Sequence, residues 1–244
     1  MTYVEGFVTP IATEARAAFA DHARRAASLS RELGAARVVD AWGDDVPAGT
    51  VNDFAGAVQL RGGETVGFSW MEFADREARD AFTKRIMADP RLAELDMPFD
   101  GGRMIFGGFR VLVDEGDSTG TGYVDGFVLP VPHGNERAYR AMAQAACIVF
   151  RDHGVTRYVE AWGDDLPVGK VTDFARAAHA RDGENVVFSW CEWPDKATRD
   201  AGMAAVMRDT RMKQMPDPMP FDGKRMIFGG FAIVQDTAQG EEPA

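Results

Sequence analysis

The 244-residue sequence predicts an α+β fold made of two similar units, and two observations support this. The first is an internal repeat: residues 3–73 align with residues 123–193 at an offset of 120, and 33 of the 71 positions are identical. The second is a shared order of strand-like and helix-like segments in each half. Because units of about 110 residues are far longer than the repeats of solenoid proteins, the pattern indicates domain duplication.

Each half is predicted to run strand, helix, strand, strand, helix, strand. In the first half, strands are expected where apolar residues alternate or cluster between turn signals, at residues 3–10, 36–45, 65–73 and 103–113. Helical spacing of apolar residues predicts a helix over 13–33, with Gly34 as its C-terminal cap. Asp75 is placed to cap a second helix that ends before Pro90. This order is that of the ferredoxin-like βαββαβ unit, whose sheet has helices on one face only.

We therefore expect two ferredoxin-like units that cover each other's open sheet faces and form a pseudo-dimeric α+β barrel. The expected bounds are 1–113 for the first unit and 123–235 for the second. Residues 114–122 are polar and glycine-rich, which is typical of a flexible linker, and 236–244 are expected to form a flexible tail. A monomer containing an internal pseudo-dimer is one expected state, and a homodimer is the alternative.

The composition argues against several classes of partner. A net charge of −11 disfavours nucleic acid as a partner, since phosphate backbones would be repelled. No apolar run approaches the roughly 20 residues of a membrane span, and the first ten residues lack the pattern of a secretory signal. The two cysteines, Cys147 and Cys191, both lie in the second half, so a disulfide framework is not expected. The sequence predicts a cytoplasmic protein, and it indicates no particular cofactor.

Four segments of the second half carry a family resemblance. They read "YVDGFVLPVP", "GDDLPVGKVTDF", "VVFSW" and "MPFDGKRMIFGGF", and each has a close copy in the first half. Together they closely resemble the YbaA-like family, catalogued as domain of unknown function 1428. The resemblance covers nearly all of both halves and implies a dimeric α+β barrel in which two sheets face each other, here as a fused tandem pair. It implies no activity and transfers no catalytic residues.

Candidate site residues follow from the alternation of side chains along strands. The mixed polar and aromatic face of each strand is predicted to point into the space between the sheets, and the apolar face of the first strand (Val4, Gly6, Val8) toward the helices. The predicted site comprises Tyr3, Glu5, Asp40, Trp42, Trp70, Glu72 and Arg103 in the first half and Tyr123, Asp125, Glu160, Trp162, Trp190, Glu192 and Arg225 in the second. Because the first strand lies beside the last in this fold, Glu5 is expected to pair with Arg103.

Several interpretations of this face stay open. The carboxylates could form a salt-bridged interior in a non-catalytic structural or interaction module. Aromatic walls with a few polar anchors could instead bind a small molecule in the inter-repeat cavity. A hard cation held by the carboxylates is a third possibility, but the spacing fixes no ligand set, so no metal site is assigned.

A cofactor-free, monooxygenase-like enzyme is a further alternative, by analogy with other α+β barrels alone. Nothing marks haem chemistry, because the four histidines have no histidine counterparts in the opposite half; they are His22, His133, His153 and His179. Whether the protein is an enzyme is left open by the sequence.

Two repeated loops have simpler explanations than a ligand site. The acidic segments 43–54 and 163–174 lack EF-hand spacing and are predicted to be turns. The segments 97–109 and 219–231 lack the order of a phosphate-binding loop and are predicted to be a turn followed by the closing strand. Glycines inside that strand, Gly107 and Gly108 in the first half, predict close contact between the halves.

Overall fold

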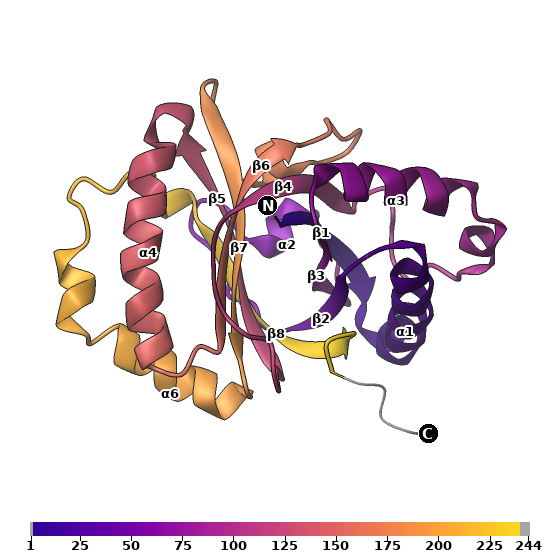
Figure 1. Cartoon of the computed structure of the whole chain (residues 1–244), viewed down its shortest axis with the longest axis horizontal. Coiled ribbons are helices and arrows are strands. Elements are labelled where there is room, and N and C mark those ends of the chain that lie inside the picture. Colours follow the sequence, from indigo (N-terminus) through magenta and orange to yellow (C-terminus); the bar gives the residue numbers. More distant parts are fainter. Residues whose placement is uncertain (1, 240–244) are drawn as a thin grey trace.

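Eight antiparallel strands close into a barrel, and the helices of the two halves lie on opposite sides of it (Figure 1). The computed structural model describes residues 2–239. The first half contributes strands β1 (Tyr3–Ala12), β2 (Arg37–Asp45), β3 (Glu64–Phe73) and β4 (Ile105–Gly116). The second half contributes β5 (Tyr123–Pro132), β6 (Arg157–Asp165), β7 (Glu184–Trp193) and β8 (Ile227–Asp236).

Six helices accompany these strands in the described part of the chain. The long ones are α1 (Arg16–Leu33) and α3 (Arg76–Ala88) in the first half, and α4 (Glu136–Asp152) and α6 (Lys196–Val206) in the second. The short ones are α2 (Phe54–Ala57) and α5 (Phe174–Ala177). Single 3-10 turns are η1 (Thr13–Ala15), η2 (Pro90–Glu94), η3 (His133–Asn135), η4 (Thr210–Gln214) and η5 (Gly223–Arg225).

The strand order around the barrel is β1-β3-β2-β8-β5-β7-β6-β4. Each half therefore forms its own four-stranded sheet, and the pairs β2–β8 and β4–β6 join the two sheets edge to edge. Joining both edges closes the barrel and leaves no unpaired edge among its eight strands, within residues 2–239. The predicted mixed α+β barrel is confirmed.

Local signals in the sequence explain most element boundaries. Gly34 ends α1 with a φ of 119°, a left-handed conformation that glycine adopts without steric cost. Asp75 caps α3 by accepting a hydrogen bond from the backbone N–H of Ala78 at 2.8 Å. The short helices α2 and α5 were not predicted. Asp53 caps α2 through the N–H of Gly56, so the acidic loop ends in a helix N-cap.

The segment expected to be a linker is tied to the barrel. Residues 114–116 continue β4, and Thr121 is buried, donating a hydrogen bond to Glu192 at 2.7 Å. In the expected tail, β8 continues to Asp236, and Gln239 donates to the carbonyl oxygen of Thr121. Residues 240–244 of that tail lie outside the described residues.

Aromatic side chains fill the barrel interior, where the sequence placed the inter-repeat cavity. Phe68 and Phe188, one from each half, stack with ring centroids 4.5 Å apart. Trp70 and Trp190 lie beside them, also with centroids 4.5 Å apart. All four side chains are fully buried. The interior is therefore a packed core shared by the two halves.

The predicted inward face is correct for β3 and β7 and wrong for the first two strands of each half. Val4, Gly6 and Val8 point into the barrel. Eight residues predicted to face inward point toward the helices instead. They are Tyr3, Glu5, Asp40 and Trp42 in the first half and Tyr123, Asp125, Glu160 and Trp162 in the second. The physical reason is crowding. A Cβ added at Gly6 would lie 3.0 Å from the Phe188 ring, so only small residues of β1 fit beside the stacked rings.

Close contact between the halves explains only one of the two glycines in the closing strand. A Cβ at Gly107 would lie 2.6 Å from Cδ2 of Leu166, in the other half. At Gly108 it would instead clash with Tyr3 of the same half.

Both cysteines are free and buried. None of the helices in residues 2–239 combines the length and apolar character that crossing a bilayer demands.

The predicted pair between Glu5 and Arg103 is wrong, because Arg103 lies in the turn before β4. It binds Glu64 through two hydrogen bonds of 2.7 and 2.8 Å and also contacts Asp100. Arg225 holds Glu184 in the same way. The guanidinium of Arg103 lowers the pKa of Glu64 to about 2, and that of Arg225 lowers the pKa of Glu184 to about 2.

These two pairs predict a loss of stability in acid. A carboxylate whose pKa falls from 4.5 to about 2 on folding stabilises the protein above pH 4.5, and this contribution disappears as the pH falls toward 2. We expect the double variant Glu64→Gln/Glu184→Gln to be less stable at pH 7 and to lose less further stability between pH 4.5 and 3. Urea unfolding at each pH measures this, with exposed Glu14→Gln as the control. An unchanged pH dependence in the double variant would contradict the assignment.

Candidate functional site

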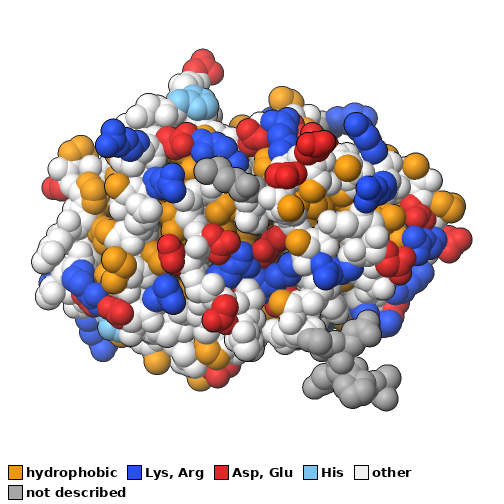
Figure 2. All heavy atoms as spheres, in the orientation of Figure 1, with side chains coloured by type: hydrophobic (Ala, Val, Ile, Leu, Met, Phe, Trp, Pro, Cys, Tyr) orange, Lys and Arg blue, Asp and Glu red, His pale blue; other side chains and the backbone are white. Residues whose placement is uncertain are grey.

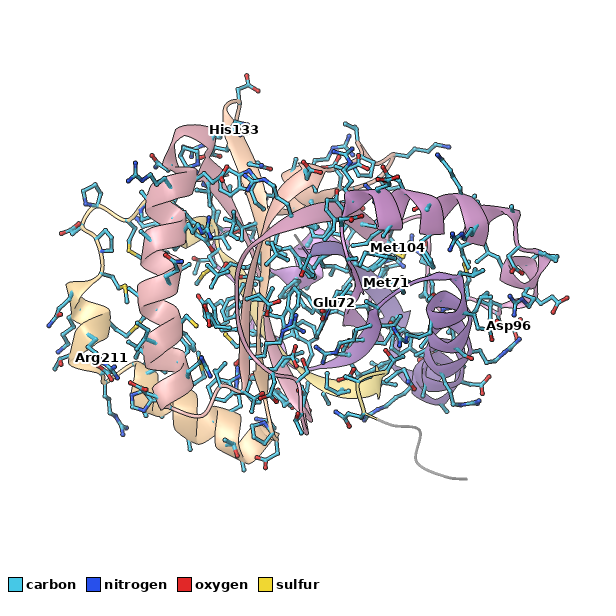
Figure 3. The ribbon with its side chains drawn as sticks, viewed as in Figure 1. Met71, Glu72, Asp96, Met104, His133 and Arg211 are labelled. Atoms are coloured by element: carbon cyan, nitrogen blue, oxygen red, sulfur yellow. The ribbon has the colours of Figure 1, made fainter. Side chains whose placement is uncertain are left out.

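A cavity of about 350 Å³ lies in the first half, outside the barrel, between the sheet and the helices α1 and α3. Its walls are mainly apolar, and phenylalanine and methionine supply much of them: Phe7, Phe19, Phe82, Phe99, Phe106, Met71, Met87, Met97 and Met104. Figure 3 shows Met71 and Met104 on this side of the barrel, whereas Glu72, the neighbour of Met71, lies nearer the barrel centre. The alternation along β3 thus sends one residue to the cavity and the next into the barrel.

Two carboxyl groups face this apolar space. Glu5 comes from β1, and Asp40 comes from β2, where it pairs across the strands with Ser69. Burial raises the pKa of Asp40, and the Ser69 hydroxyl and His22 oppose this shift only in part. Burial likewise raises the pKa of Glu5, against the lowering effect of Arg79, whose nearest nitrogen lies 4.0 Å away. Carboxyl groups in such surroundings can exchange a proton at higher pH than usual.

His22 is the histidine in the cavity wall. It lies on α1, and its Nδ1 is 2.6 Å from the carbonyl oxygen of Asp96. Its ring meets Phe99 edge to face, with centroids 5.2 Å apart. The imidazole is therefore held in place by the segment that follows η2.

The corresponding space in the second half is filled by the protein's own side chains. Glu160, at the position of Asp40, accepts hydrogen bonds from the hydroxyls of Tyr139 at 2.6 Å and Tyr158 at 2.5 Å. Asp125, at the position of Glu5, accepts hydrogen bonds from Trp193 at 2.9 Å and from Arg199 at 2.8 Å. Both carboxylates are thus satisfied by side chains of the protein, so the two halves differ here although their sequences repeat.

A buried charge network lies at one end of the barrel. Arg37 binds Glu192 through bonds of 2.8 and 3.0 Å and Asp236 through bonds of 2.9 and 2.7 Å. Arg157 binds Glu72 and Asp114 with the same geometry. Each arginine therefore pairs with the glutamate of the opposite half.

The tryptophans in the barrel belong to this network. Trp70 and Trp190 each donate an indole N–H to the glutamate two residues on, at 3.0 Å. Burial raises the pKa of Glu72, but the Arg157 guanidinium outweighs it and holds the pKa below its usual range. The sequence interpretation of a salt-bridged interior is thus correct for this end of the barrel alone.

Sequence reasoning missed both arginines and two of the acids. Arg37 and Arg157 are identical residues at the offset of 120, and Asp114 and Asp236 are identical at the offset of 122 that follows the second helix. This repetition was the available signal. Asp114 was assigned to the linker and Asp236 to the tail, so neither was considered for the interior.

Among the remaining predicted site residues, the two tyrosines hold the halves together. The hydroxyl of Tyr3 donates to Asp164 at 3.1 Å, and that of Tyr123 donates to Asp44 at 3.0 Å. The acidic loops therefore bind residues of the opposite half, which supports their interpretation as structural turns. Trp42 packs against Phe19, with centroids 5.8 Å apart, on the helix side of the sheet.

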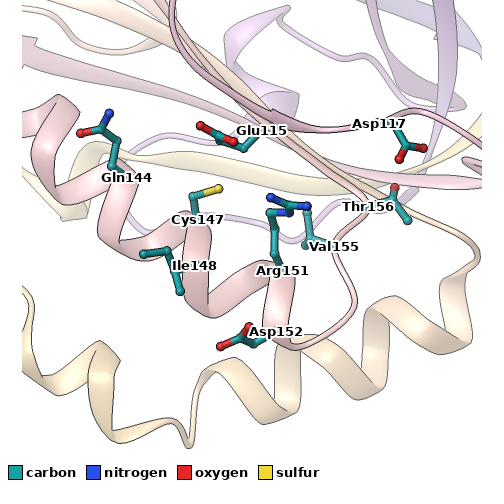
Figure 4. Close-up of a pocket in the computed structure, with 9 residues that line it drawn as sticks. All are labelled: Glu115, Asp117, Gln144, Cys147, Ile148, Arg151, Asp152, Val155 and Thr156. Atoms are coloured by element: carbon teal, nitrogen blue, oxygen red, sulfur yellow. The ribbon is translucent and has the colours of Figure 1, made fainter.

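A second hollow, of about 790 Å³, runs along α4 (Figure 4). Its walls include Glu115, Asp117, Arg151 and Asp152, so its lining is about as polar as it is apolar, whereas that of the first-half cavity is mainly apolar. Figure 2 shows basic and acidic side chains intermixed over the face in view, with hydrophobic atoms scattered between them. Within residues 2–239, no group of three or more His, Cys, Asp or Glu side chains is placed to hold a metal ion.

The charge network predicts that removing one partner of a buried ion pair lowers the stability of the protein far more than removing one partner of an exposed pair. We expect Glu192→Ala to lower the free energy of unfolding by about 3–5 kcal/mol, because Arg37 would keep a buried, partly unpaired charge. Glu32→Ala, which removes an exposed partner of Arg91, should have a much smaller effect. Chemical denaturation compares the two; similar small losses would mean that the network does not hold the barrel.

Comparison with known proteins places the chain in a family. The profile of the family described as "Protein of unknown function (DUF1428)" matches residues 2–101 and again 122–223. Uncharacterized protein YbaA of Escherichia coli K12 is 53% identical over 114 residues, which are 47% of this chain and 97% of YbaA. YbaA of Shigella flexneri matches to the same extent. One unit of this chain thus corresponds to almost the whole relative.

Solved structures of similar fold span both halves. A Lactobacillus acidophilus protein named "putative monooxygenase" is 10% identical, with a TM-score of 0.61 over 96% of this chain and 95% of its own. An anthrone oxidase-like protein is 14% identical, with a TM-score of 0.52 over 100% of this chain and 95% of its own. At such identities the likeness shows the fold alone. The family profile, in contrast, matches most of both halves, which confirms the YbaA-like resemblance: the chain belongs to the DUF1428 family.

Proposed function

We propose that the first half binds a small, mainly apolar molecule in its cavity, with Asp40 and Glu5 as polar anchors. The observation that carries this proposal is the contrast between the halves: the same fold is filled with side chains on one side and leaves about 350 Å³ on the other. Small-molecule sites are concave, mostly apolar and furnished with a few polar groups, and their volumes begin at about 300 Å³.

The mouth of the cavity supports the same function. Met87, Met97 and Phe106 line it and are exposed to 73%, 55% and 42%. Methionine side chains are flexible and polarisable, so they adapt to ligands of different shape. Apolar residues at an entrance also favour the arrival of an apolar ligand.

We further infer that each half is one ferredoxin-like unit, with bounds near 1–113 and 123–235, and that the chain is a monomer containing its own pseudo-dimer. The strand order β4-β1-β3-β2 within the first half and the helices on one face of its sheet support this. The edges that a second chain would need are already paired by β2–β8 and β4–β6.

Filling the cavity tests the binding proposal. Ser30 lines the cavity and is buried, and the second half has Phe150 at this position. We expect wild-type protein to bind the fluorescent apolar probe 1-aminoanthracene, and Ser30→Phe to weaken that binding at least tenfold because the ring occupies the space.

The matched control is Ser28→Phe, the same substitution at an exposed position of α1. It should leave the affinity unchanged. Thermal unfolding checks that both variants are folded. Equal affinity for the probe in wild type and Ser30→Phe would place the probe elsewhere and contradict the proposal.

A second candidate function is cofactor-free oxidation of the bound molecule. Two solved proteins of similar fold are named as a monooxygenase and as anthrone oxidase-like, and Asp40, whose pKa burial raises, could accept a proton from a substrate. One dioxygen oxidises one naphthol to a naphthoquinone and one water, so no external reductant is needed. We expect dioxygen uptake when 2-naphthol is added and a large loss of it in Asp40→Asn. No uptake by the wild-type protein would argue against this reaction.

A further inference from the structure

The second half shows which groups bind the carboxyl group of Glu160, the counterpart of Asp40, when side chains fill the space around it. The two oxygens of Glu160 each accept one phenolic hydroxyl, from Tyr139 and from Tyr158. Both tyrosines and Glu160 are buried. The Tyr158 ring also packs against Phe150, with centroids 5.7 Å apart. This half therefore contains a phenol, bound by a carboxylate and an aromatic wall, as part of its own chain.

The first half lacks each of these groups while it keeps the carboxyl. Phe19 stands where Tyr139 stands, which removes one hydroxyl, and Val38 stands where Tyr158 stands, which removes a whole phenol. Asp40 is one methylene shorter than Glu160. Among residues 2–239, no tyrosine hydroxyl takes the place of the two that Glu160 receives. The space that opens is the cavity, and Asp40 faces it.

Glu5 has lost a donor in the same way. Its counterpart Asp125 accepts a hydrogen bond from the indole N–H of Trp193, and the first half has Phe73 at that position, which has no donor. Both carboxyl groups of the cavity have therefore lost partners that their copies in the second half retain. Asp40 keeps the Ser69 hydroxyl and Glu5 keeps Arg79 at 4.0 Å, so each carboxyl group has fewer donors than its copy. A ligand that supplies a further donor is therefore favoured over one that does not.

We propose that the ligand of the first half is a phenol: an aromatic molecule whose hydroxyl donates to Asp40 and whose ring lies where the second half keeps the ring of Tyr158. This inference rests on the proposed binding function and names the ligand class. Replacement of Phe150 by Ser30 leaves extra room beside the ring, so substituted phenols fit as well. The wall residue Phe99 is kept as Phe221 in the second half, where it packs against Tyr139 with centroids 5.8 Å apart.

Matched probes test whether the hydroxyl group of the ligand contributes to binding. The probes are 4-ethylphenol, 4-ethyltoluene, in which a methyl group replaces the hydroxyl, and the cation 4-ethylbenzylamine. Protein NMR titrations of the full chain give each affinity and show whether the amides that shift lie around Asp40 or around Glu160. We expect 4-ethylphenol to bind at least tenfold more tightly than 4-ethyltoluene, because a hydrogen bond to a carboxylate discriminates by this much or more.

Variants test where the hydroxyl binds. In Asp40→Leu, which is similar in shape, the preference for 4-ethylphenol should fall to about twofold or less. Val38→Tyr should abolish binding, since it restores the tyrosine of the second half, and the reciprocal Tyr158→Val should create a second set of shifting amides around Glu160. Because these two variants change opposite halves, loss of folding in one leaves the other as the test.

The outcomes separate this inference from the proposed function. Equal affinities for 4-ethylphenol and 4-ethyltoluene, both weakened in Ser30→Phe, would overturn the proposal that the ligand is a phenol and leave the proposal of cavity binding intact. Tighter binding of 4-ethylbenzylamine would replace the phenol by a cationic ligand. A preference for the phenol that survives in Asp40→Leu would overturn the role of Asp40. Absence of binding by all three probes and by 1-aminoanthracene would overturn both proposals.

Discussion

The crossed pairs between Arg37 and Glu192 and between Arg157 and Glu72 are the constraint on which the rest of the structure depends. Each pair joins the two halves, is buried and uses two hydrogen bonds, so the sheets can meet in only one register. The indole N–H groups of Trp70 and Trp190 each donate a further hydrogen bond to one of these glutamates, and the two indole rings contact each other across the barrel. With these rings stacked, the barrel interior is full, and the space for a ligand has to lie on the outer faces, under the helices.

The outer faces are where the halves have diverged. In the interior the two copies keep the same aromatic and charged residues: Phe68 and Trp70 stack on their own copies, and each arginine of the network binds the glutamate of the opposite half. Tyr139, Tyr158 and Trp193 fill one face, and Phe19, Val38 and Phe73 leave space in the other.

Fusion of two units makes this asymmetry possible. A pair of identical chains would carry every substitution twice, whereas a tandem chain can fill one face for stability and keep the other open. The match of the relative YbaA to about half of this chain fits this view of a duplicated unit. The carboxyl groups show the division most clearly: Glu160 is satisfied by tyrosine hydroxyls, and Asp40 faces a cavity.

The sequence by itself determined the duplication, the order of strands and helices, the caps at Gly34 and Asp75, and the family, because these depend on local patterns that survive in a single chain. Alternation also sorted the residues of the first three strands of each half correctly into two sets. Only the tertiary structure decided which set of β1 and β2 faces inward, since both sets contain apolar residues and the choice depends on how much room the stacked rings leave beside Gly6. It alone brought Arg37 to Glu192, because 155 residues separate them in the chain, and it alone showed that one of two similar halves encloses a cavity.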